Sequence, residues 1–224
     1  MFPEIPQEIG SIHAYRDSVI DNLEHDDNNE YYDSLVELMC ADCLICGEAV
    51  KQQNDTSENA GLIDEIIRIA EALDSHDEYY VTRYRVCSWT LELCANHPRL
   101  RVRLLEATIN AFMAIEGTED YDAGQLEVYR SELARFQHNI AYADLGEFDK
   151  IEGKGYLLHD PVEWTEQFEN VIDRAEAEAY RHLTDVPRGL GFCHAYWQAL
   201  KDALAAEGVE WRTPSEMNPK VMFD

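Results

Sequence analysis

Apolar side chains recur at helical spacing along most of this chain, and this periodicity constrains the fold more than any other feature. In the segment 30–52 they stand at i, i+4, i+7, i+11 and i+14, at Val36, Cys40, Cys43, Gly47 and Val50. Residues with this spacing lie on one face of an α-helix. Other segments repeat the pattern and none alternates convincingly like a strand, so we predict an all-α fold.

Turn and capping signals divide the chain into about eight helices with short connections. Helices joined in this way pack as antiparallel hairpins, in a bundle or a short irregular solenoid. We expect a single domain over residues 1–224, with the main helical body at 10–145. The C-terminal helices and a docked tail follow at 156–224, as a subdomain at most.

The C-terminal part has the clearest boundary signals. Asp160, Pro161 and Glu163 form a helix-start signature, which predicts a helix from residue 161 to about 183, and Gly208 is placed to end a helix that begins near Phe192. A second cap, Thr213–Pro214–Ser215–Glu216, follows Trp211. We therefore predict a structured tail that packs its apolar side chains, Trp211 among them, against the body.

The turn at 146–151, with the sequence GEFDKI, resembles the inter-helix turn of tetratricopeptide repeats. It departs from that pattern because Ile151 stands where a small residue is expected, and Gly153 and Gly155 interrupt the second helix. No period of about 34 residues recurs in the chain. The resemblance supports the solenoid only as an alternative architecture, and it implies no function.

Charge limits the classes of partner. The chain has 18 basic and 45 acidic residues, a net charge of −27. Such a protein lacks the cations that bind a nucleic-acid backbone or an anionic membrane, so we expect neither partner. A protein partner or a homo-oligomer is the expectation. The first ten residues show no signal peptide and no apolar run is long enough to span a bilayer, which favours a cytoplasmic location.

Arginines gather in the one window with a positive balance. Residues 81–115 contain 5 basic and 2 acidic side chains. We propose Arg83, Arg85, Arg99 and Arg103 as contacts for a partner or an anion. The alternative is that these arginines pair with carboxylates of the same chain.

Three cysteines stand at the spacing Cys40-x-x-Cys43-x-x-Cys46, which could hold zinc or an iron–sulfur cluster. Their segment is strongly helical, however, whereas cluster motifs usually lie in loops. A free cysteine behaves as a small apolar residue. We therefore expect core cysteines and no metal or cofactor, with the metal site as the weaker alternative.

Cys193 and His194 are the one adjacent Cys–His pair and follow a Gly-x-Gly turn. A thiol at a helix N-terminus can be nucleophilic. Neighbouring side chains on a helix point about 100° apart, so this thiol and imidazole are poorly placed to act together. They stay weak catalytic candidates.

Two hypotheses for function follow. The first is a protein-interaction module, acting as an adaptor, a regulator or an inhibitor, since no catalytic motif is visible. The second is an enzyme or metalloprotein whose site is assembled from dispersed His, Asp, Glu and Cys residues. The sequence leans toward the first and identifies neither a partner nor a substrate.

Overall fold

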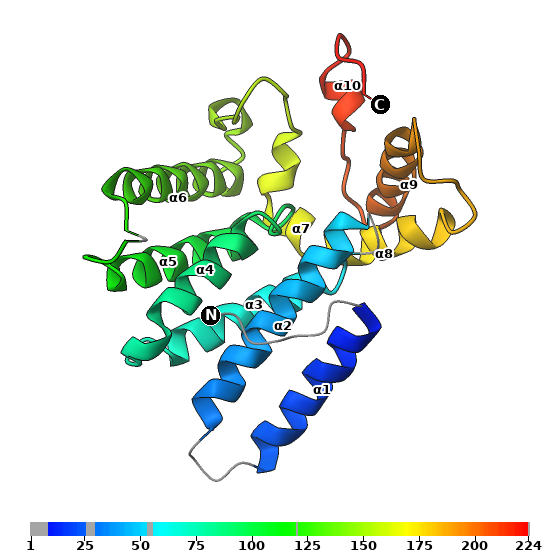
Figure 1. Cartoon of the computed structure of the whole chain (residues 1–224). Helices are drawn as coiled ribbons and strands as arrows, with labels where there is room; N and C mark the ends of the chain where they lie inside the picture. The colour runs from blue at the N-terminus through cyan, green and yellow to red at the C-terminus, as the bar shows by residue number, and fades with distance from the viewer. Residues whose placement is uncertain (1–8, 26–29, 53–55, 120, 224) are drawn as a thin grey trace. The chain divides into compact units, whose positions relative to one another are not determined.

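The computed structural model describes residues 9–25, 30–52, 56–119 and 121–223, and in these residues the chain is all-α (Figure 1). It contains ten α-helices, eight of them at least seven residues long, and the described residues contain no strand. The predicted all-α fold is confirmed. None of the described helices is both long enough and apolar enough to cross a membrane.

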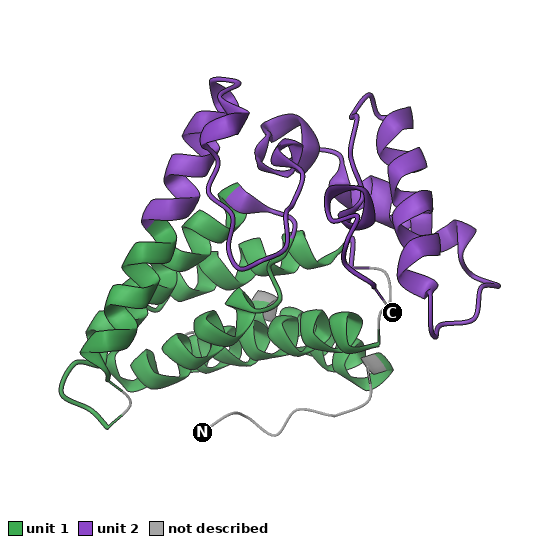
Figure 2. Ribbon diagram, turned by 90° about the horizontal axis from the view of Figure 1, so that it is seen from above, with its two compact units in different colours: residues 1–53, 58–95, 99–133 green, residues 54–57, 96–98, 134–224 purple. Residues whose placement is uncertain are grey.

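Contacts between residues divide the chain into two compact units, coloured separately in Figure 2. Unit 1 comprises residues 1–53, 58–95 and 99–133, and unit 2 comprises residues 54–57, 96–98 and 134–224. The main segment of unit 2 thus begins at residue 134, within a helix, whereas the sequence suggested a C-terminal subdomain from residue 156. Two short connecting segments of the first half of the chain also belong to unit 2.

Unit 1 is a layered helical body. Its helices are α1 (Ile9–His25), α2 (Tyr31–Lys51), α3 (Asn59–Ala72), α4 (Tyr80–Leu91), most of α5 (Pro98–Ala114) and the first half of α6 (Ala123–Asp144). Helix α2 packs against α1, α3 and α4. Of the apolar stripe predicted on α2, Val36, Cys40 and Cys43 lie in the core, whereas Gly47 is half-buried and Val50 is 42% exposed.

Unit 2 centres on a pair of helices, α8 (Ile172–His182) and α9 (Phe192–Ala206), which pack side by side. Their core includes Phe168, Ile172, Leu200 and Leu204. The second half of α6, the short helices α7 (Glu166–Glu169) and α10 (Pro214–Met217), and two 3-10 turns, η2 (Phe148–Lys150) and η3 (Pro161–Trp164), also belong to the unit.

One helix expected from the sequence, from residue 161 to about 183, is broken into η3, α7 and α8. The break follows from a second cap, because Thr165 is extended (φ −82°, ψ 149°) and its hydroxyl accepts a hydrogen bond from the Phe168 amide. Asp160 caps the first piece, as predicted, although that piece is a 3-10 turn. Two N-caps that stand five positions apart cannot belong to one continuous helix.

The end of α9 directs the chain back to the core of unit 2. Gly208 has a φ of 83°, and the amides of Gly208 and Val209 donate to the carbonyls of Ala205 and Leu204. This is a Schellman ending, which needs a residue that tolerates positive φ. Val209 and Trp211, which follow, are buried against α8 and α9.

Candidate functional site

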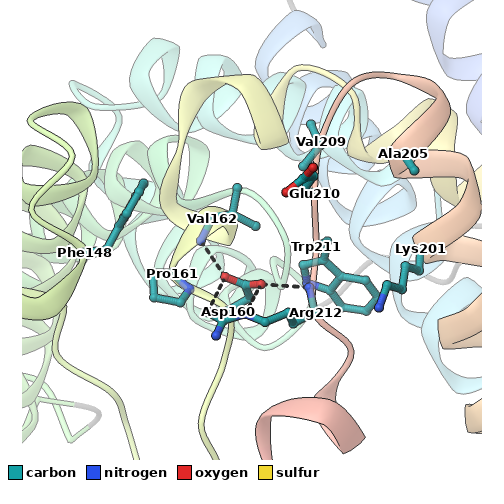
Figure 3. Close-up of a pocket in the computed structure, with 10 residues that line it drawn as sticks. All are labelled: Phe148, Asp160, Pro161, Val162, Lys201, Ala205, Val209, Glu210, Trp211 and Arg212. Carbon is teal, nitrogen blue, oxygen red and sulfur yellow. Dashed lines mark hydrogen bonds and ion pairs between the residues drawn. The ribbon is translucent and has the colours of Figure 1, made fainter.

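A pocket of about 550 Å³ opens in unit 2 and is the candidate site (Figure 3). Its walls come from η2, from the start of η3, from α9 and from the segment after α9. The residues that line it are Phe148, Asp160, Pro161, Val162, Lys201, Ala205, Val209, Glu210, Trp211 and Arg212. Its size lies within the range of small-ligand and side-chain pockets.

Asp160 holds two walls of the pocket together. Its Oδ2 accepts hydrogen bonds from the Arg212 backbone amide at 2.8 Å and from Arg212 Nε at 3.0 Å, and its Oδ1 accepts from Arg212 Nη2 at 3.2 Å. The same Oδ1 accepts from the Val162 amide at 3.2 Å. Figure 3 shows the carboxylate between these two residues. Asp160 is only 5% exposed, so these four hydrogen bonds satisfy a buried charge.

Trp211 forms the apolar wall. The residue is 5% exposed, and its indole N–H donates to Glu163 Oε1 at 2.8 Å. The other oxygen of Glu163 lies 3.3 Å from His159 Nδ1. The hydrogen bond between the His159 ring and Glu163 raises the pKa of His159, and partial burial of the ring opposes the shift. The tryptophan is therefore fixed in orientation as well as buried.

The charges of the pocket are unevenly paired. Arg212 pairs with Asp160, and Lys201 Nζ contacts Glu216 at 2.5 and 2.7 Å. Within the described part of the chain the exposed Glu210 side chain has neither a hydrogen bond nor an ion pair. Glu210 thus leaves the pocket with one unbalanced negative charge.

The chain segment beside the pocket, residues 145–158, exposes several large apolar side chains. Leu145 is 73% exposed, Phe148 42%, Tyr156 84% and Leu158 59%. Phe148 also lines the pocket. We call residues 145–158 the apolar segment. Glycines at 146 and 155 with positive φ turn the backbone there, so the segment forms no long helix whose apolar face could be buried.

A second polar cluster of unit 2 surrounds Glu176 on α8. The residue is 5% exposed, and its carboxylate accepts hydrogen bonds from Thr56 Oγ1 at 2.7 Å, Asn96 Nδ2 at 2.7 Å and Tyr196 Oη at 2.9 Å. Burial raises the pKa of Glu176, and these hydrogen bonds oppose the shift. These hydrogen bonds attach Thr56 and Asn96, from two connecting segments, to α8.

His97 lies in the same cluster. Its Nε2 is 2.8 Å from Asp173 Oδ1, and its Nδ1 is 4.0 Å from Glu169 Oε1. Burial of the ring lowers its pKa, but the hydrogen bond that the ring donates to Asp173 and the charges of Asp173, Glu169 and Glu176 outweigh burial, so the pKa is raised overall. The acidic neighbours of His97 therefore favour the protonated form of its ring.

The arginines proposed from the sequence lie apart from the pocket lining. Arg83 is 2% exposed and donates to Asp74 Oδ1 at 2.9 Å, while its Nε and Nη2 have no partner among the described residues. Arg103 pairs with Asp64 at 2.5 Å. Arg85 is exposed and Arg99 half-buried. The structure thus pairs Arg83 and Arg103 within unit 1, and their role as partner contacts stays a prediction.

The cysteines proposed as a weak metal site are core residues. Cys40, Cys43 and Cys46 are at most 1% exposed, and Thr90 Oγ1 donates to Cys43 Sγ at 3.3 Å. Burial raises the pKa of Cys40 to about 12 and that of Cys43 to about 11. No group of three or more His, Cys, Asp or Glu side chains in the described residues has a geometry that could hold a metal ion.

Cys193 and His194 stand in the first turn of α9. Cys193 is half-buried, whereas His194 is exposed and its Nε2 lies 3.3 Å from the Phe223 carbonyl oxygen. The imidazole packs edge-on against Trp197, which also contacts the Phe223 ring. His194 is thus involved in docking the tail, and neither residue lines the pocket.

Sequence reasoning found the cap at Asp160 and the docked Trp211 but missed that they meet in a pocket. It also missed Glu176, although a signal existed. Glu176 is an acid within the buried stripe of α8 formed by Ile172, Ala175 and Ala179. A carboxylate on such a stripe needs hydrogen-bond donors from elsewhere in the fold.

Comparisons with models of protein families, with curated protein sequences and with solved structures find no match to this chain.

Proposed function

We propose that this protein is an interaction module that binds another protein through unit 2. The observation that carries the proposal is the apolar segment beside the pocket, where Leu145, Phe148, Tyr156 and Leu158 are each more than 40% exposed. Single exposed apolar residues are ordinary, whereas a group of them beside a pocket is typical of a protein contact.

The composition of this surface supports a protein partner. Exposed aromatic side chains such as Phe148 and Tyr156 contribute large contact areas at little entropic cost, and they are enriched where proteins bind each other. The part of the chain that carries them is acidic, since residues 134–224 contain 17 acidic and 9 basic residues. A module of this kind acts as an adaptor, a regulator or an inhibitor, according to what its partner does.

Site-specific photo-crosslinking tests the proposal. A photoreactive phenylalanine analogue replaces Phe148 or Leu158, and in control proteins it replaces Met113 or Val128, which are 49% and 55% exposed in unit 1. Each protein is irradiated in a lysate of its source cells. We expect one discrete protein to crosslink at positions 148 and 158 and to be competed by excess unmodified chain.

The controls determine how the result is interpreted. Equal crosslinking at all four positions would mean nonspecific apolar contact, and crosslinking at positions 113 or 128 alone would move the interface to unit 1. Either outcome contradicts the proposal.

A further inference from the structure

The pocket of unit 2 combines two aromatic residues with an acidic side chain that has no ionic partner. Phe148 and Trp211 line it together with Glu210. The two cations in its lining are already neutralised, Arg212 by Asp160 and Lys201 by Glu216. A group that enters therefore meets apolar surface and one net negative charge.

We propose that this pocket binds an arginine side chain of a basic segment of the partner protein. A guanidinium group is planar, so it stacks on an exposed aromatic ring such as that of Phe148 while it donates hydrogen bonds to a carboxylate such as Glu210. Its aliphatic stem packs on apolar surface, which the half-buried Pro161 and Val162 provide. The inference rests on the proposed function and names the chemistry of its partner.

The surroundings of the pocket favour a partner segment in which basic and apolar residues are interspersed. Between the exposed Phe148 and Tyr156 the apolar segment carries the exposed acids Asp149 and Glu152 and the exposed Lys150 and Lys154. The acidic excess comes from unit 2 more widely, because residues 134–224 contain 17 acidic and 9 basic residues. Such a surface complements a chain that offers cations and apolar side chains together. The charge also disfavours a second copy of this protein, because two chains of −27 repel each other.

Calorimetric titration of the full chain with defined peptides tests the inference. The first probe is a short peptide in which arginine alternates with leucine, and matched peptides replace arginine with lysine, glutamine or glutamate. We expect the arginine peptide to bind best, the lysine peptide more weakly and the glutamate peptide not at all. Raising the salt concentration from 0.05 to 0.3 M should lower the affinity for the arginine peptide by about tenfold.

Matched variants locate the binding. Glu210→Gln removes the unpaired charge and should lower the affinity for the arginine peptide by about fivefold. Phe148→Ala should weaken it by a similar factor. Asp185→Asn is the control, since Asp185 is an exposed acid of unit 2 outside the pocket lining, and it should have almost no effect.

The possible failures are distinguishable. Preference for the glutamine or glutamate peptide, with loss of binding in Phe148→Ala, would overturn the arginine inference and leave the interaction function intact. Equal weakening by Glu210→Gln and Asp185→Asn would show general charge attraction and would also overturn it. A dimer in light scattering that Phe148→Ala dissociates would make a second copy the occupant.

Discussion

Arg212 donates to the carboxylate of Asp160 with both its backbone and its side chain, although 52 positions separate the two residues. The same carboxylate caps η3 through the Val162 amide. One buried acid thus fixes the start of η3 and the strand-like segment after α9. These are two of the walls of the pocket.

Asp160→Ala should lower the free energy of unfolding of unit 2 by about 2–4 kcal/mol. The change removes a helix cap and leaves the Arg212 amide without its acceptor. The ion pair itself adds little, because the Arg212 side chain is 58% exposed. Urea denaturation followed by tryptophan fluorescence measures the loss. Glu210→Ala, which removes an unpartnered acid of the same pocket, should change stability by less than about 0.5 kcal/mol.

Truncation should distinguish the packed part of the tail from its exposed end. A chain that stops after Gly208 loses Val209 and Trp211 from the core and should be destabilised by about 4 kcal/mol or more. A chain that stops after Asn218 keeps both residues, and it keeps the capping box of Thr213 and Glu216. The free energy of unfolding of this longer product should fall by less than about 1.5 kcal/mol. If the full chain and the chain that stops after Gly208 unfold at the same temperature, the docked tail is contradicted.

His97 should make the stability of unit 2 depend on pH. Its pKa in the folded protein is raised above the ordinary value of 6.5, so the protonated ring is favoured by folding. That stabilisation is complete below pH 6.5 and is lost as the pH rises from there through the raised value. Unfolding experiments at pH 6 and pH 8 should show the wild type losing more stability at high pH than His97→Gln does. His138→Gln, at an exposed histidine of the same unit, is the control.

Thiol reactivity should separate Cys193 from the other five cysteines. Those five are buried, whereas Cys193 is half-buried. Because the thiolate is the reactive form, burial and the raised pKa values of Cys40, Cys43 and Cys87 slow their alkylation. Mass spectrometry after brief iodoacetamide treatment should find Cys193 modified at least about tenfold faster than any of the five buried cysteines. Rapid labelling of Cys43 in the folded protein would contradict its placement in the core.

Much of the fold could be predicted because its signals are local. Helical spacing placed α2, and Gly208 and the Thr213 cap marked boundaries that the structure confirms. The prediction of one continuous helix from residue 161 was wrong, because a second cap at Thr165 interrupts it. Thr165 can cap a helix or continue one, and spacing alone does not show which.

The candidate site could not be predicted, because its key pairs are distant in sequence. Asp160 meets Arg212, and Glu163 meets Trp211, only after the Schellman ending of α9 returns the chain. Glu176 likewise depends on Thr56 and Asn96, from two connecting segments far upstream. In each case a single residue type has many possible partners, and tertiary packing selects one.

Hydrogen–deuterium exchange of the full chain, with and without the partner captured by crosslinking, tests the central claim most directly. If unit 2 is the interaction surface, exchange should slow in the apolar segment and at residues 205–212, and stay unchanged at the Met113 and Val128 controls. Protection confined to residues 83–103, the arginine window of unit 1, would contradict the account.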